Sequence, residues 1–170
     1  PAEEIRNAKL PLDPNPRKPV PNALVKNGMQ VTLQKNPKNF HHWNNGMTIA
    51  ATQVQYDKKN TPPTMKLSFE KGDGICNGGH TYLSIENFPT SIDSNALVRI
   101  EVVTIPSTIK NRKDKILNIC RFRNLNNKLT AETEANYLGY YEDFKSILGD
   151  KAKFYRWYQG DTNAVNDPYD

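Results

Sequence analysis

Apolar and polar residues alternate in several stretches of the chain, and a period of two is typical of half-buried β-strands. The longest such stretch covers residues 96–105, and residues 47–56 and 65–69 show the same pattern. A shorter apolar set at residues 29–33 indicates one more short strand. Together these segments predict a small β-sheet.

Two later segments predict helices. The first covers residues 109–124, with an apolar side made of Ile109, Ile116, Leu117, Cys120 and Phe122. Its polar side carries six basic residues against one acid, Asp114; the basic residues are Lys110, Arg112, Lys113, Lys115, Arg121 and Arg123. The second covers residues 131–148, where Thr130 stands at the N-cap position and Gly149 ends the helix.

The remaining segments complete the expected fold. Residues 1–9 form either the end of a helix or an unanchored tail, and the aromatic residues 154–158 form a last strand or helix that packs on the core. We expect an α/β or α+β fold, with helices flanking a small mixed sheet. The predicted domain covers residues 1–160, and a flexible tail covers residues 161–170.

A glycine-rich segment at residues 72–81 is the centre of the predicted chemistry. It lies between the strand at 65–69 and a short helix at 83–88, which Pro89 stops. A turn between a strand and a helix leaves backbone N–H groups unpaired at the helix start, where an anion can bind. The alternative is an ordinary tight turn without a ligand.

Residues in this turn suit a phosphate group. Gly78 and Gly79 lack the Cβ atoms that would hinder close approach of a phosphate. Asn77, His80 and Thr81 supply side chains that can form hydrogen bonds with it.

The composition of the chain indicates which classes of molecule it can bind. The chain has 170 residues, enough for one domain with its own core, and a formal net charge of +5, which favours an anionic partner such as nucleic acid or a nucleotide. Its two cysteines form no CxxC and no zinc spacing, which is typical of a reducing cytoplasm and of buried thiols. No apolar run approaches the roughly 20 residues of a membrane helix.

Other residues extend the predicted phosphate site. Arg17 stands near the end of an extended proline-rich segment at residues 10–19, and Arg121 and Arg123 belong to the basic helix. All three could neutralise a phosphate through paired N–H groups. His41 and His42 are adjacent, and neighbours on a strand point to opposite faces, so we expect no metal site from this pair.

Three short motifs resemble the signatures of the abortive-infection phage-resistance (AIPR) family. They are F-x-x-W-N-N-G-M-T-I at residues 40–49, I-C-N-G-G-H-T at residues 75–81 and R-N-L-N-N at residues 123–127. His80 stands where the family usually has Gln. The resemblance implies a role in phage defence, and it adds Asn44, Asn45 and Asn124 to the candidate residues, together with the nearby Asp73.

A more distant resemblance is to the ParB/sulfiredoxin-like fold. Residues 10–17 resemble the proline-arginine box that opens ParB-like domains, and residues 75–80 lie where those proteins have a phosphate-binding turn. The resemblance implies that the turn and the following helix bind nucleotide phosphates. Thr81 replaces the arginine of ParB-like turns, and Arg123 stands where they have Glu.

These observations leave three functions open. The first is a phage-defence domain that binds nucleotide or DNA phosphate through the glycine-rich turn. The second is a metal-dependent DNA nuclease or NTPase, with a nucleoside triphosphate and Mg²⁺, in which Asp73 with His80, Glu70 or His42 holds the ion; no D-x-n-E-x-K or HNH pattern supports it. The third is a non-enzymatic sensor of a phage protein. A homo-oligomer is compatible with all three, and no catalytic residue is assigned.

Overall fold

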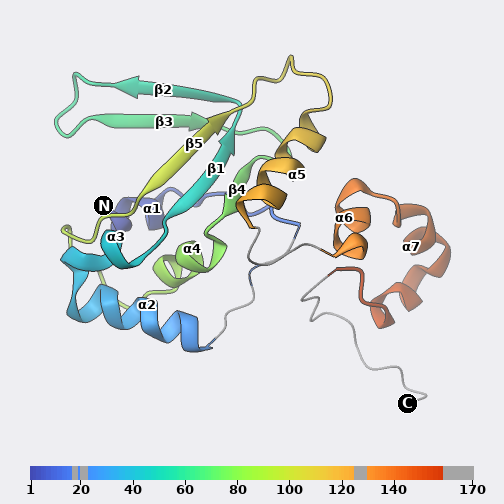
Figure 1. The fold of residues 1–170 in the computed structure, drawn as a ribbon, viewed down its shortest axis with the longest axis horizontal. Helices are drawn as coiled ribbons and strands as arrows, with labels where there is room; N and C mark the ends of the chain where they lie inside the picture. The colour runs from blue at the N-terminus through green and yellow to red at the C-terminus, as the bar shows by residue number, and fades with distance from the viewer. Residues whose placement is uncertain (17–18, 20–22, 125–129, 159–170) are drawn as a thin grey trace.

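A three-stranded mixed sheet forms the centre of the molecule (Figure 1). The computed structural model describes residues 1–16, 19, 23–124 and 130–158. Strand β1 (Met47–Ala51) lies in the middle, antiparallel to β4 (Gly74–Asn77) and parallel to β5 (Ile100–Thr104). The predicted mixed sheet flanked by helices is therefore confirmed.

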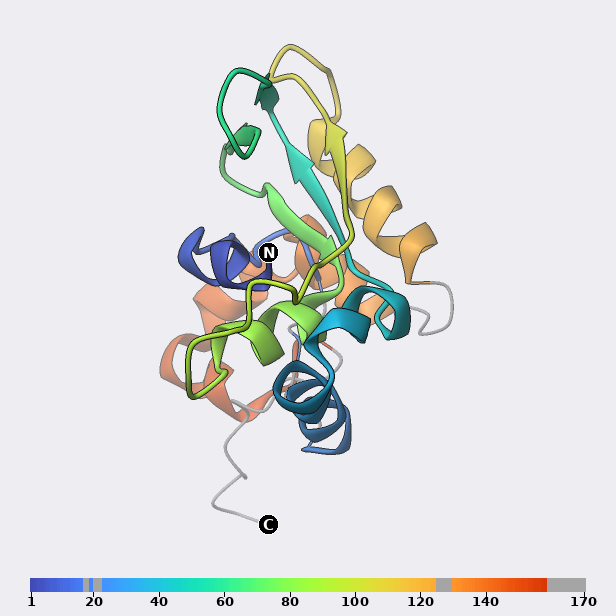
Figure 2. The same cartoon turned by 90° about the vertical axis from the view of Figure 1, so that its left-hand side faces the viewer.

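Strand β1 is buried on both faces, since helices cover the two sides of the sheet (Figure 2). Met47 and Ile49 pack with Tyr82 on the side of α4 (Gly79–Glu86), where α1 (Ala2–Asn7) also lies. Ala50 packs on the opposite side, in the cluster that contains Ile105 and three residues of α5 and β4: Ile116, Cys120 and Cys76. The candidate site described below therefore lies next to the most deeply buried part of the sheet.

The strand predicted at residues 47–56 is two strands. The chain bends at Thr52, whose N–H donates to the Ser68 carbonyl at 2.8 Å, and then continues as β2 (Gln53–Asp57). Strand β2 pairs with β3 (Thr64–Ser68) as a two-stranded hairpin beside the main sheet (Figure 1).

The strand predicted at residues 29–33 is wrong, because this segment belongs to helix α2 (Ala23–Lys35). Met29 and Leu33 are four residues apart and pack into one core cluster, whereas Val31 is 47% exposed on another side. In a strand all three side chains would lie on one face, so this burial pattern fits a helix and not a strand.

Residues around the two adjacent histidines are also helical. Short helices η1 (Pro37–Asn39) and α3 (Phe40–Trp43) precede β1, so the expectation that His41 and His42 lie on a strand is wrong. Their ring centroids are 3.9 Å apart.

The first residues are anchored and do not form a loose tail. The Ala2 N–H donates to the Ala96 carbonyl at 2.7 Å, and Arg6 donates to the carbonyl oxygens of Phe88 and Thr90.

The basic helix predicted at residues 109–124 is α5 (Arg112–Arg123). Ile116, Leu117 and Cys120 form its buried side as expected, but Phe122 is 63% exposed and does not belong to it. Asn111 at its N-cap has a positive φ of 56°, which explains why the helix begins later than predicted.

The helix predicted at residues 131–148 is two helices, α6 (Ala131–Leu138) and α7 (Glu142–Leu148), followed by η2 (Gly149–Phe154). Gly139 ends α6 in the left-handed conformation, with φ of 86°. Thr130 caps α6 as predicted, since its side chain accepts the Thr133 N–H. The tail predicted at 161–170 lies outside the described residues.

The longest of the helices in the described ranges, α2, has 13 residues. None of these helices is long and apolar enough to cross a bilayer.

Candidate functional site

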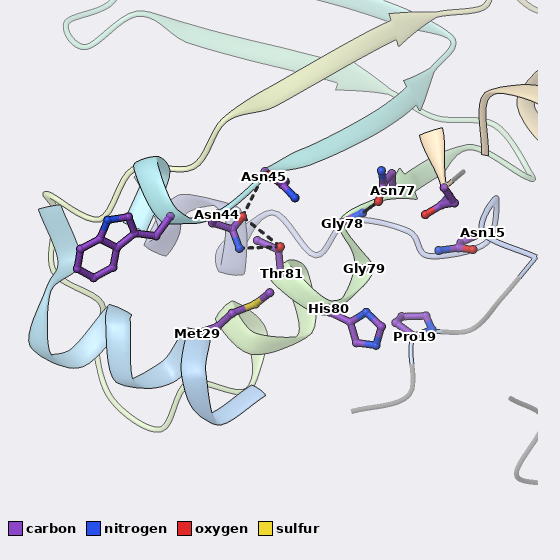
Figure 3. A pocket seen from close by; sticks show the side chains of 13 residues that line it. Asn15, Pro19, Met29, Asn44, Asn45, Asn77, Gly78, Gly79, His80 and Thr81 are labelled. Atoms are coloured by element: carbon purple, nitrogen blue, oxygen red, sulfur yellow. Dashed lines mark hydrogen bonds between the residues drawn. The ribbon is translucent and has the colours of Figure 1, made fainter. Parts of the chain in front are cut away.

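The described parts of the three signature segments meet at one cavity of about 310 Å³ (Figure 3). The cavity lies where β4 passes into α4, beside the turn that enters β1 and the end of α5. Its walls consist mainly of glycines and asparagines, and the lining residues are Asn15, Pro19, Met29, Trp43, Asn44, Asn45, Gly46, Asn77, Gly78, Gly79, His80, Thr81 and Asn124.

A strand, a turn and a helix follow one another here, but with other bounds than predicted: residues 74–77 of the predicted turn form β4, and α4 begins at Gly79 rather than at residue 83. Asn77 ends β4, Gly78 adopts the left-handed conformation with φ of 87°, and Gly79 begins α4. The Tyr82 N–H makes an α4 hydrogen bond to the Gly78 carbonyl at 3.0 Å. The N–H groups earlier in the helix have no acceptor within it, and they belong to residues that line the cavity. The positive end of the α4 dipole is therefore directed to the cavity.

Packing explains why two residues of the turn are glycines. A Cβ atom on Gly78 would lie 2.4 Å from the Gly46 carbonyl oxygen, and one on Gly79 would lie 2.9 Å from Cγ of Pro19. Both positions therefore exclude larger residues even without a ligand, and a substitution there would disturb the turn as well as any bound group.

Asn44 and Thr81 join two walls of the cavity (Figure 3). Asn44 Nδ2 donates to Thr81 Oγ1 at 3.1 Å, and the Thr81 hydroxyl lies 3.2 Å from Asn44 Oδ1. Asn44 Oδ1 also accepts the Gly46 N–H at 2.8 Å. These side chains, both predicted as candidates, hold the turn before β1 against the first turn of α4.

Asn77 and Asn124 make the corresponding connection to α5. Asn77 Nδ2 donates to the Arg123 carbonyl at 2.7 Å, and its Oδ1 accepts the Gly78 N–H at 2.6 Å. Asn124 Nδ2 donates to the carbonyl oxygens of Cys76 and Cys120, at 3.1 and 2.6 Å. The end of the basic helix is thereby fixed beside the glycine turn.

The two arginines predicted from α5 do not line the cavity. Arg121 forms an ion pair with Glu134 of α6, and Arg123 forms one with Glu101 of β5. Among the cavity-lining residues that the structure describes, none is Lys, Arg, Asp or Glu. Arg17 lies outside the described residues, although Asn15 and Pro19, which flank it in sequence, both line the cavity.

Asp73 lies apart from the cavity lining and is fully buried. Its carboxylate is paired with Arg112, whose Nη2 is 2.5 Å from Oδ1 and 2.7 Å from Oδ2. It also accepts the Thr52 hydroxyl at 2.8 Å and the Glu70 N–H at 2.9 Å. Through these contacts, Asp73 anchors the bend between β3 and β4.

The described residues contain no group of three or more His, Cys, Asp or Glu side chains placed to hold a metal ion. Asp73, Glu70, His42 and His80, which the metal-dependent hypothesis combined, do not form such a group. Only His80 of these four lines the cavity.

Sequence reasoning missed several cavity residues. The strand predicted at residues 29–33 gives Met29 no place at the cavity, whereas the structure puts it on α2 in the cavity lining. Trp43 stands inside the first signature, and its 65% exposure is visible only in the fold. Asn15 belongs to the proline-rich segment, where no periodicity indicates a contact.

Comparison with known proteins gives a family but no structural relative. The model of one family, described as AIPR protein, matches residues 12–167. No curated protein and no solved structure matches the chain. The ParB/sulfiredoxin-like relation therefore stays a prediction. Since the match includes the proline-rich segment, the cavity and the helices after it, the chain belongs to the AIPR family, which is consistent with an abortive-infection phage-defence domain.

Proposed function

We propose that this chain is a phage-defence domain that binds the phosphate of a nucleotide or of DNA at the N-terminus of α4. The observation that carries the proposal is the convergence of residues from the three signature segments on one cavity, where their side chains are hydrogen-bonded to one another or to neighbouring backbone. A cavity of about 310 Å³ lies at the lower end of the range for small-molecule sites, about 300–1,000 Å³.

The backbone supplies the main attraction for the phosphate. The first N–H groups of α4 and the helix dipole favour an anion at this end of the helix. Asn77 contributes indirectly, because it accepts the Gly78 N–H and fixes the turn. The bound phosphate would occupy the space between the turn and Asn45.

The side chains divide into two groups in this proposal. Asn44, Asn77, Thr81 and Asn124 position the walls, since their polar atoms bond to other cavity segments. Asn45 is exposed on the cavity wall and His80 lines the cavity from the first turn of α4, and we infer that both contact the ligand.

The countercharge comes from Arg17 in this proposal, because its sequence neighbours Asn15 and Pro19 line the cavity. Arg121 and Arg123 join the phosphate only by exchanging their carboxylate partners, Glu134 and Glu101, for it.

A thermal-shift titration tests the proposal. Nucleotides, pyrophosphate, single-stranded DNA and duplex DNA are compared, each with and without Mg²⁺. A ligand at one hundred times its Kd stabilises the native state by about 2.7 kcal/mol, or roughly 5–10 °C for a domain of this size.

The matched variants are His80→Ala and His42→Ala, because His42 is exposed and does not line the cavity. We expect the first variant to reduce the shift and the second to retain it. The proposal is contradicted if no phosphate compound shifts the melting temperature, or if both variants behave as the unmodified chain.

A further inference from the structure

Trp43 presents an unusually large aromatic surface to solvent on the cavity wall. Its side chain is 65% exposed, whereas tryptophan side chains are usually well buried. It ends the short helix α3, in which Phe40 is 1% exposed and anchors the segment in the core. The next residue, Asn44, is bonded to Thr81 and to the Gly46 N–H.

The Trp43 backbone is therefore fixed on both sides while its ring is left uncovered. An aromatic side chain has only two χ angles, so ordering the ring against a flat ligand costs little conformational entropy. Base stacking on aromatic side chains is a general mode of nucleotide binding.

Two further features of the lining agree with a nucleobase. Met29 reaches the same cavity from α2 and offers a deformable apolar contact. Asn45 is an exposed amide on the wall and can bond to the edge of a base. The described lining has no Lys, Arg, Asp or Glu that would favour a second charged group over a neutral ring.

We propose that Trp43 and Met29 form a nucleobase subsite, so that the ligand of the cavity is a nucleotide with an unpaired base. The inference rests on the proposed phosphate site, which would hold the other end of the same ligand. A base inside a duplex is already stacked and paired, and its faces are not available to Trp43. The ligand is a free nucleotide or a nucleotide of a single strand, and both offer the same chemistry.

Tryptophan fluorescence reports on this subsite directly. The chain has two tryptophans. The second, Trp157, packs near Tyr141 and Tyr155 and donates to the Ala152 carbonyl at 2.9 Å. A Trp157→Phe background therefore leaves Trp43 as the single reporter. In that background we expect nucleotides to quench the fluorescence saturably. Pyrophosphate should displace the nucleotide without quenching, and blunt duplex DNA should not quench.

The variant Trp43→Ala separates the two subsites. We expect the nucleotide Kd to rise roughly tenfold or more, as for the loss of one base-stacking contact, while the pyrophosphate Kd stays within about twofold. Trp43→Phe should recover part of the nucleotide affinity. Because the ring is exposed, the melting temperature without ligand should change little.

The possible failures are distinguishable. Unchanged nucleotide affinity in Trp43→Ala, with pyrophosphate still bound, overturns the nucleobase subsite and leaves the phosphate site. Loss of pyrophosphate binding to the same extent shows that Trp43 is structural and also overturns the inference. If neither a nucleotide nor pyrophosphate binds to the unmodified chain, and an oligothymidine strand does not quench its fluorescence, the phosphate site and the subsite are overturned together. Quenching by an oligothymidine strand but not by free nucleotides retains the subsite and assigns it to single-stranded nucleic acid.

Discussion

Asn44 and Thr81 lie 37 positions apart in sequence, and their side chains contact each other through two donor–acceptor distances of 3.1 and 3.2 Å. The pair connects the turn before the central strand to the first turn of α4. Because Asn44 also accepts the Gly46 N–H, a single amide determines how far apart two walls of the cavity stand. The shape of the cavity therefore depends on a contact that also stabilises the fold.

Asn44→Ala is expected to lower the free energy of unfolding by about 1–3 kcal/mol, since the Gly46 N–H and the Thr81 hydroxyl both lose a partner in a partly buried place. Thr81→Val should cost about 1 kcal/mol. Urea unfolding of the two single variants and the double variant measures the coupling. We expect the double variant to lose clearly less than the sum, and strict additivity would contradict the contact.

Arg112→Met is expected to destabilise the chain by about 3–5 kcal/mol, because it leaves the fully buried Asp73 carboxylate without its counterion. The matched control is Arg121→Met, which breaks a partly exposed pair with Glu134 and should cost at most about 1 kcal/mol. Chemical denaturation of both variants makes the comparison. Equal losses would mean that Asp73 is not the anchor described above.

Tyr82 makes the stability of the folded chain depend on pH in the alkaline range. Burial, helped by the hydrogen bond to Glu86, raises the pKa of Tyr82 to about 12. The pKa of tyrosine in an unfolded chain is near 10, so Tyr82 stays protonated to a higher pH in the folded state than in the unfolded state. This contribution to stability is complete below pH 10 and is lost as the pH rises from about 10 to 12. Urea unfolding between pH 9 and 11 should show a shallower decline for Tyr82→Phe.

Tyr56→Phe is the control for that experiment, because Tyr56 is 58% exposed and should leave the decline unchanged. The same decline in Tyr82→Phe and the unmodified chain would show that Tyr82 does not cause it.

Cys76 and Cys120 should resist thiol reagents in the native state. Both are fully buried, which keeps a reagent from either sulfur. The hydrogen bond between the two thiols lowers the pKa of Cys76 and, together with burial, raises the pKa of Cys120, so burial is the barrier that protects Cys76. A colorimetric thiol assay should show slow reaction in native buffer and rapid reaction of two thiols after denaturation. Rapid reaction without denaturant would show that the α5 side of the core opens readily.

Strands β1 and β5 of the central sheet and the two strands of the hairpin lie largely within segments whose apolar and polar residues alternate, whereas β4 lies within the segment predicted as a turn. Residues 29–33 were mistaken for a strand because three apolar residues at spacing two also suit a helix, when one of them, Val31, faces solvent. The break at Gly139 was missed because a single glycine is tolerated inside a helix, so only its left-handed conformation reveals the end of α6.

Among the candidate residues, the glycines and asparagines line the cavity, whereas Arg121 and Arg123 do not. The partners of these asparagines are far away in sequence: Asn44 contacts Thr81, Asn77 contacts the Arg123 carbonyl, and Asn124 contacts the Cys76 carbonyl. Arg121 and Arg123 have long side chains, and their acidic partners come from α6 and β5. No local sequence pattern shows which carboxylate such an arginine side chain reaches.

The backbone amides of the glycine turn provide the most direct test of the phosphate site. A titration followed by ¹H–¹⁵N correlation spectroscopy would use a nucleotide and, separately, pyrophosphate. We predict saturable shifts of the Gly78, Gly79 and Thr81 amide signals with both compounds, while the Gly139 signal at the end of α6 stays in place. Unchanged signals from the three turn residues at millimolar concentrations of both compounds would contradict the account.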